Sequence, residues 1–435
     1  MIKTLQTLLD HGKKTGFSTV EAFAETLEKH EYECFPDEPP SLHASDTRRV
    51  TVRAFWDSGD PVGFSLSKPN PDSIKSAFST IYTTHLPDEK ENYGHLLPGE
   101  VKKTTVNIFD ESIQTVDVHT FNDFIDGINE IMISSPFQGL KIQKIHLAKT
   151  LKKIYIANTN NLNVKYRKTN FNMILSFTLG PNRVDISENR VFFRQFEPFK
   201  IISRGFNLLN SLTEAGVSAG KQMAVILSPE ASAFILREFS QYFKISADQE
   251  IMNIHYPSIL NLVDNPAMDD QVGSVPFDDE GVQSGEKYLI RKGVFSSVIS
   301  DIASAFQNKA RSTGNGSRSD RSLFPAVEFS NLYIKPTVLS LKNLMADAGE
   351  GVLVSLLKLK VIDNNGYLFS AYGYRFSSDE LLEPVHFYFR TSFRSYFLRI
   401  LKISKEIKFF YSSANIGSPY ILLEARKQAD NLFEI

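Results

Sequence analysis

Cysteine and tryptophan are nearly absent, with one of each among 435 residues. The single cysteine, Cys34, excludes an internal disulfide and any cysteine-based metal cluster. No apolar run reaches the ~18 residues of a membrane-spanning helix. The N-terminus becomes charged at Asp10 before a signal-peptide core forms. We therefore expect a cytoplasmic protein with no membrane partner.

Net charge is also small, because 48 Lys and Arg residues face 50 Asp and Glu residues, for a net charge of -2. Binding to a phosphate backbone needs a clustered basic face, so nucleic acid is not an expected partner. Hydrophobic residues make up 42% of the chain and include 34 Phe. This composition indicates a large core and, at this length, two or three domains.

Local patterns predict an α+β fold. Ser228-Pro229 suits the start of a helix over 229–243, and Lys292-Gly293 suits a turn between two strands. Residues 18–34 fit both a capped helix and a half-buried strand, so their conformation stays open. The remaining expected elements are helices at 1–16, 72–84, 119–133 and 204–219 and a hairpin at 49–66.

Two boundaries divide the chain. Residues 86–105 hold two prolines, two glycines and many charges, which places the first boundary near residue 95. The second falls near Gly220, before the β-branched run QMAVIL. We predict a small α+β domain at 1–95, a central mixed α+β domain at 96–220, and a mainly β domain at 221–435.

Familiar catalytic motifs are missing, including the Gly-x-Ser-x-Gly elbow, the Walker loop and the Rossmann fingerprint. The nine histidines are scattered, and solvated or hydrogen-bonded histidines are favoured over a metal site built from distant ones. Cys34 has Glu31, Glu33 and Asp37 nearby. Negative neighbours raise a thiol pKa, so an inert thiol is favoured over a nucleophile.

The acidic triplet Asp278-Asp279-Glu280, in SVPFDDEG, is the sharpest local feature. Its carboxylates could bind a cation or a peptide amine, or perturb one another for acid/base work. A plain turn bracketed by Pro276 and Gly281 is the favoured alternative. The segment STGNGSRSDRS at 312–322 is either a solvated loop or a lid. In a lid, Arg311, Arg318 and Arg321 would meet a peptide carboxylate.

Several segments together resemble the TldD/PmbA family, the metallopeptidase-related proteins also called modulators of DNA gyrase. The most specific is the Pro-Phe-Asp-Asp-Glu-Gly core followed by a strand, a Lys-Gly turn and another strand, at 274–305. Other similar segments are VTVRAFWDSGDPVGFSL, IANTNNLNVKYRKT, TGNGSRS, SNLYIKP, GEGVLVSLL and IGSPYILLE. The resemblance covers nearly the whole chain.

The two branches of that family differ at one helix. In the TldD branch His-Glu-x-x-x-His supplies two zinc ligands and a base. Here PEASAFILREFSQYF places Arg237, Glu238 and Tyr242 at those positions, and residues 390–435 lack the branch's C-terminal cysteine. The resemblance therefore implies the PmbA branch, also called TldE, with no metal in this chain and zinc in a TldD-type partner.

Three functions follow from these observations. The first is a PmbA/TldE-like subunit that binds unfolded peptides for hydrolysis by the zinc-bearing partner and is not catalytic alone. Its candidate substrate-binding residues are Asp278, Asp279, Glu280 and Arg318. The second is a non-enzymatic homodimer that binds peptides. The third is an independent metallopeptidase in which the acidic triplet holds a metal with other ligands.

Overall fold

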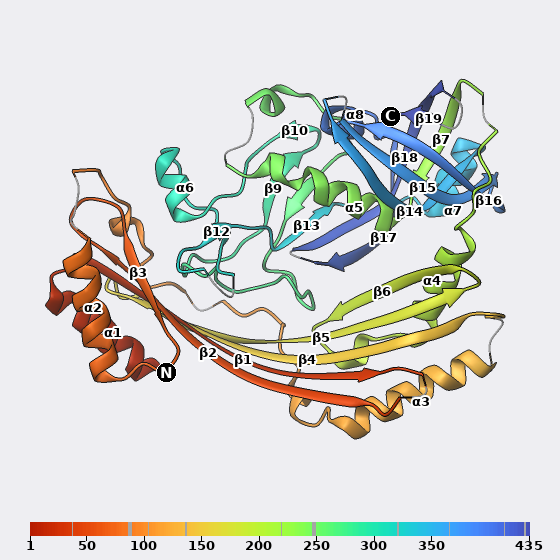
Figure 1. Cartoon of the computed structure of the whole chain (residues 1–435). Coiled ribbons are helices and arrows are strands. Elements are labelled where there is room, and N and C mark those ends of the chain that lie inside the picture. Colours follow the sequence, from red (N-terminus) through yellow and green to blue (C-terminus); the bar gives the residue numbers. More distant parts are fainter. Residues whose placement is uncertain are drawn as a thin grey trace.

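A long curved sheet from the N-terminal half lies beneath a second body of strands from the C-terminal half (Figure 1). The computed structural model describes residues 1–36, 38–85, 89–102, 104–134, 137–218, 220–245, 249–319, 322–364, 366–412, 414–429 and 432–435. Within these residues, no helix combines the length and the apolar character needed to cross a bilayer.

The N-terminal sheet is antiparallel throughout, in the order β3-β2-β1-β4-β5-β6. Its strands are β1 (Thr19–Cys34), β2 (Ser41–Phe55), β3 (Val62–Leu66), β4 (Lys141–Asn158), β5 (Asn163–Leu179) and β6 (Asn182–Arg190). Because β1 pairs with β4, strands from both sides of residue 95 form one sheet.

Four helices cover one face of this sheet. They are α1 (Ile2–Thr15), α2 (Pro71–Thr84), α3 (Val118–Ser134) and α4 (Pro198–Asn210). Alternate residues of each strand pack against them, as Val20, Ala22 and Ala24 do in β1. The intervening residues, including Glu21 and Arg53, therefore point from the opposite face toward the C-terminal half.

The C-terminal half is built on an 11-stranded sheet that partly closes on itself. Six of its strands form a ring, because the path β18-β19-β16-β15-β14-β7 returns to β18. The ring strands are β7 (Gln222–Leu227), β14 (Glu350–Asp363), β15 (Gly366–Ser377), β16 (Glu380–Thr391), β18 (Asn415–Ala429) and β19 (Leu432–Glu434). The others are β8 (Leu262–Asp264), β9 (Lys287–Arg291), β10 (Val294–Phe295), β13 (Asn331–Ile334) and β17 (Lys402–Tyr411).

Helices pack on both sides of β7. Val225 and Leu227 lie in the same apolar cluster as α5 (Pro229–Phe239), whereas Ile226 lies with α7 (Leu341–Ala348). Burial on both sides explains why this strand is a continuous apolar run. The remaining short elements are α6 (Ile302–Gln307), α8 (Phe393–Leu398), β11 (Gly316–Ser317) and β12 (Ala326–Val327).

The predicted α+β class and the mainly β character of the C-terminal half are confirmed. Residues 19–34, left open by the sequence, form a strand. The helix predicted over 204–219 was placed wrongly, because α4 begins at Pro198 and ends at Asn210. Proline suits the first helical position, where no N–H is needed. The domain boundary near residue 95 stays a prediction, and any division there runs through a continuous sheet.

Candidate functional site

The acidic triplet forms a turn at the junction of the two halves. Both oxygens of Asp278 accept backbone N–H bonds: Oδ1 from Glu280 and Val282, at 3.0 and 2.9 Å, and Oδ2 from Gly316 at 2.9 Å. Burial and the nearby Glu280 raise the pKa of Asp278 well above its ordinary value. The turn interpretation is therefore correct for Asp278, whose carboxyl joins two loops.

Glu280 belongs to a buried row of alternating charges that joins the two halves. Arg53 of β2 donates to Glu280 Oε1 at 2.9 Å and to Glu21 Oε2 at 2.7 Å, and Arg318 donates to Glu21 Oε1. All four charged side chains are 0–1% exposed. Burial opposes ionisation of Glu21, but Arg53 and Arg318 outweigh it and lower its pKa. We call Glu21, Arg53, Glu280 and Arg318 the charge row.

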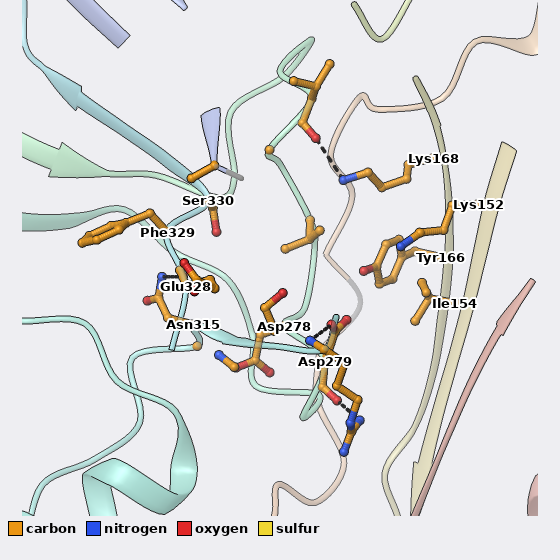
Figure 2. Close-up of a pocket in the computed structure, with 18 of the residues that line it drawn as sticks. Lys152, Ile154, Tyr166, Lys168, Asp278, Asp279, Asn315, Glu328, Phe329 and Ser330 are labelled. Atoms are coloured by element: carbon orange, nitrogen blue, oxygen red, sulfur yellow. Dashed lines mark hydrogen bonds between the residues drawn. The ribbon is translucent and has the colours of Figure 1, made fainter. Parts of the chain in front are cut away.

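Asp279 lines a cavity of about 160 Å³ between the halves, which we call the motif cavity. Figure 2 shows Asp278 and Asp279 on one side and Lys152, Tyr166 and Lys168, from β4 and β5, on the other. The SVPFDDEG segment therefore lies at a cleft and not on an open face. Burial raises the pKa of Asp279 even though Arg318 N–H donates to its Oδ2 at 2.7 Å.

Lys168 faces the acidic side of this cavity. Its Nζ donates to the carbonyl oxygens of Val272 and Ser274, at 3.0 and 3.4 Å. Burial and, secondarily, Lys152 lower the pKa of Lys168 to about 8, although Asp279 opposes the shift. An ordinary lysine has a pKa of about 10.4. Near pH 8 the Lys168 amine is therefore present in both its charged and its neutral form.

We predict that a titration will detect this amine directly. After reductive ¹³C-methylation, one dimethyl-lysine resonance should titrate near pH 8, where the neutral fraction of Lys168 exceeds that of an ordinary lysine on the order of a hundredfold. The variant Lys168→Arg should lack that resonance and keep the others. A Lys168 resonance that titrated above pH 10 would contradict the burial of this amine.

At the three zinc-motif positions, the side chains do not fit a metal ion. The Arg237 guanidinium of α5 stays protonated and lies 3.0 Å from Glu238 Oε1. Tyr242 lies in the next turn, a 3-10 helix at Ser240–Phe243, with its ring centroid 4.7 Å from that of Phe393. Neither side chain offers a neutral imidazole, and only Glu238 keeps the type of residue the motif has.

The acidic triplet is also poorly suited to binding a metal ion, as an independent metallopeptidase would require. Backbone N–H groups occupy both oxygens of Asp278, while Arg53 and the Ile302 N–H occupy those of Glu280. Within the described ranges, no three His, Cys, Asp or Glu side chains gather as metal ligands would. Burial raises the pKa of the half-buried Cys34 thiol, in keeping with an inert side chain.

A groove runs along β17, first between the halves and then within the C-terminal half. One cavity of about 360 Å³ extends from β6 and Gln271 to Lys408, and a second of about 380 Å³ continues from Lys408 to Pro229 at the start of α5. A third, of about 130 Å³, lies beside α5 and reaches Arg237. Phe410 lines all three, so they form one continuous surface, which we call the β17 groove.

Sequence reasoning missed the residues from the N-terminal sheet: Glu21, Arg53, Lys152, Tyr166 and Lys168. The sequence signal that could have found them is the presence of charged residues at alternate positions of otherwise apolar strands. Among the predicted residues, Arg318 is buried against Glu21 and Asp279, Arg311 is exposed, and Arg321 lies outside the described residues. Direct peptide binding by Arg318 or Glu280 stays a prediction, since their contacts are internal.

Comparison with known proteins identifies a family match in the C-terminal half of the chain. Residues 220–429 match the family described as PmbA/TldA metallopeptidase C-terminal domain. This part of the chain belongs to the PmbA/TldD family. The resemblance noted in the sequence is thereby confirmed, and the region includes the acidic turn, α5 and β17.

The whole chain shares its fold with solved structures of other proteins. TldE from Thermococcus kodakarensis superposes with a TM-score of 0.84 at 17% identity, covering 97% of this chain and 98% of that one. A Thermotoga maritima protein described as a modulator of a DNA gyrase gives 0.80 at 16% identity, covering 97% and 98%. At these identities the likeness establishes the fold alone.

Sequence relatives bear metalloprotease names. A zinc metalloprotease TldD homologue from Saccharolobus solfataricus is 29% identical over 189 residues, which are 41% of this chain and 42% of that protein. The first curated relatives are matched over only 28% and 42% of their own lengths. The chain is thus related to metallopeptidases and folded like TldE, although its α5 lacks the imidazole ligands.

Proposed function

We propose that this chain is a metal-free, PmbA/TldE-like subunit that binds unfolded peptides for hydrolysis by a zinc-bearing TldD-type partner. The observation that carries the proposal is Arg237 on α5. A fixed positive charge there would repel a zinc ion by several kcal/mol at short range in a poorly solvated cleft, and Tyr242 would have to ionise to replace the second imidazole. The partner must then supply the metal.

The β17 groove supports peptide binding. β17 pairs with β18 on one edge, and on the other edge Ser404 and Lys405 bond to residues 337–339. No other named strand in the described part of the chain pairs with β17, so the remainder of that edge is free for main-chain hydrogen bonds. The groove carries charges of both signs, from Glu188, Arg190, Lys200 and Lys408, beside the apolar ring of Phe410. Such a surface suits an extended chain of mixed sequence.

Reconstitution tests this proposal. The purified chain should contain no stoichiometric zinc by elemental analysis and should not hydrolyse an unstructured peptide. Adding a TldD-type paralogue should produce activity that disappears when the partner's zinc-binding histidines are replaced. That activity should survive Glu238→Ala in this chain, because Arg237 and Tyr242 beside it do not form a metal site with its carboxylate.

Two results would contradict the assignment. About one zinc per chain, with chelator-sensitive peptidase activity in the isolated protein, would place catalysis in this subunit. Failure to associate with a TldD-type paralogue, together with peptide binding by a stable homodimer, would support the non-enzymatic alternative.

A further inference from the structure

We propose that the cavity beside α5 binds the C-terminal carboxylate of a peptide whose last side chain is apolar, with Arg237 as the anchoring cation. We call it the α5 cavity. Its described lining residues are Glu230, Ala233, Phe234, Arg237, Phe410, Tyr411, Ser412 and Ile416. The inference rests on the proposed peptide binding and names the class of peptide that the site takes.

Contacts with Phe234 and Glu238 orient the Arg237 guanidinium and leave one of its edges free to bind a ligand. Its Cζ lies 4.7 Å from the centre of the Phe234 ring, and its Nε and Nη2 donate to Glu238 Oε1 at 3.2 and 3.0 Å. Nη1 makes no hydrogen bond to another described residue, and the side chain is 41% exposed. Guanidinium groups bind carboxylates through short, charge-assisted hydrogen bonds, so a second carboxylate can approach this edge.

The rest of the lining favours an anion with an apolar side chain. Glu230, the lining carboxylate, is bound by Arg204 through two hydrogen bonds of 2.9 and 2.6 Å, which neutralise its charge. Ala233, Phe410 and Ile416 provide apolar walls. Arg237 is the only cation among the described lining residues, and its partly exposed contact with Glu238 leaves Nη1 without a hydrogen bond to another described residue. A cation or an N-terminal ammonium would meet repulsion here.

The position of the cavity fits the end of a bound peptide. Phe410 and Glu230 line both this cavity and the adjoining part of the β17 groove. A peptide extended along β17 would therefore reach Arg237 with one of its ends. The guanidinium selects the carboxylate end, and the apolar walls select an apolar last residue.

Peptide-end chemistry tests the inference. A fluorescent, unstructured octapeptide ending in Leu would be prepared as the free acid and as the amide, and binding to the full chain would be followed by anisotropy. The acid should bind about tenfold more tightly than the amide, as expected for loss of one charge-assisted contact. A peptide ending in Glu should bind more weakly than the Leu peptide.

Variants at two neighbouring positions sharpen the test. Arg237→Gln should bind acid and amide equally, at the level the amide shows with the unaltered chain. Glu238→Gln removes the competing carboxylate, so it should raise affinity for the acid several-fold and leave the amide unchanged. Arg375→Gln, in an exposed pair with Glu383 outside this cavity, is the matched control and should behave like the unaltered chain. Circular dichroism would check folding of each variant.

Equal binding of acid and amide by the unaltered chain would overturn this inference while leaving peptide binding intact. Binding of neither peptide, by the chain alone or with a TldD-type partner, would overturn the proposed function as well. A preference for the acid that persisted in Arg237→Gln would move the anchor to another cation and thus refute the role of Arg237.

Discussion

Replacing Arg53 with alanine should lower the free energy of unfolding by about 3–5 kcal/mol, the usual loss when one partner of a buried ion pair is removed. Arg53 is 1% exposed and lies between the carboxylates of Glu21 and Glu280. Without it, the carboxyl groups of Glu21 and Glu280 would remain in the interior, with Arg318 as the only remaining cation of the charge row. Their desolvation would no longer be offset.

The chain offers its own probe for this measurement. Trp56, the single tryptophan, is buried three residues after Arg53, so its fluorescence reports the N-terminal sheet during urea unfolding. Arg375→Ala, which removes an exposed salt bridge, should change stability by no more than about 0.5 kcal/mol. Adding Glu280→Gln to Arg53→Ala should recover part of the loss. A loss below about 1 kcal/mol for Arg53→Ala would contradict the burial of the charge row, because it would show that water solvates these charges.

Gly281→Ala should lower stability by about 2–4 kcal/mol, through backbone strain and a side-chain clash. Gly281 ends the acidic turn with φ +79°, a left-handed conformation that an L-residue adopts at a cost. A Cβ atom there would lie 2.2 Å from Leu162 Cδ2, in a cluster with Phe23 and Ile156. Alanine would therefore push the turn away from the N-terminal sheet.

Two further variants separate the causes. Gly285→Ala, four residues along, meets no atom within 4 Å and has no positive φ, so it should stay within about 0.5 kcal/mol of the unaltered chain. Leu162→Ala removes the methyl groups that would clash with an alanine side chain at position 281, although the cavity it leaves lowers stability by itself. The double variant should then lose at least about 1 kcal/mol less than the sum of the single losses. Strict additivity in urea unfolding would show that the clash contributes nothing.

Local sequence by itself determined much of the secondary structure. Ser228-Pro229 begins α5, Gly16 ends α1 with φ 112°, and the Lys292-Gly293 turn joins β9 to β10. Each signal works through the backbone geometry of its own residues, so no distant contact was needed. The absence of imidazoles at 237 and 242 is likewise a property of the sequence.

Tertiary structure alone decided what meets the acidic turn. Alternation along a strand shows that Glu21 shares a face with neighbours two residues away, but not which loop lies opposite that face. The pairing of β1 with β4, more than 100 residues apart, brings Lys152 and Lys168 to the same face as Arg53. The charge row and the motif cavity therefore arise from packing between the halves, and the β17 groove reaches Arg237 because α5 packs against β17 within the C-terminal half. Contacts between such distant segments leave no local periodicity in the chain.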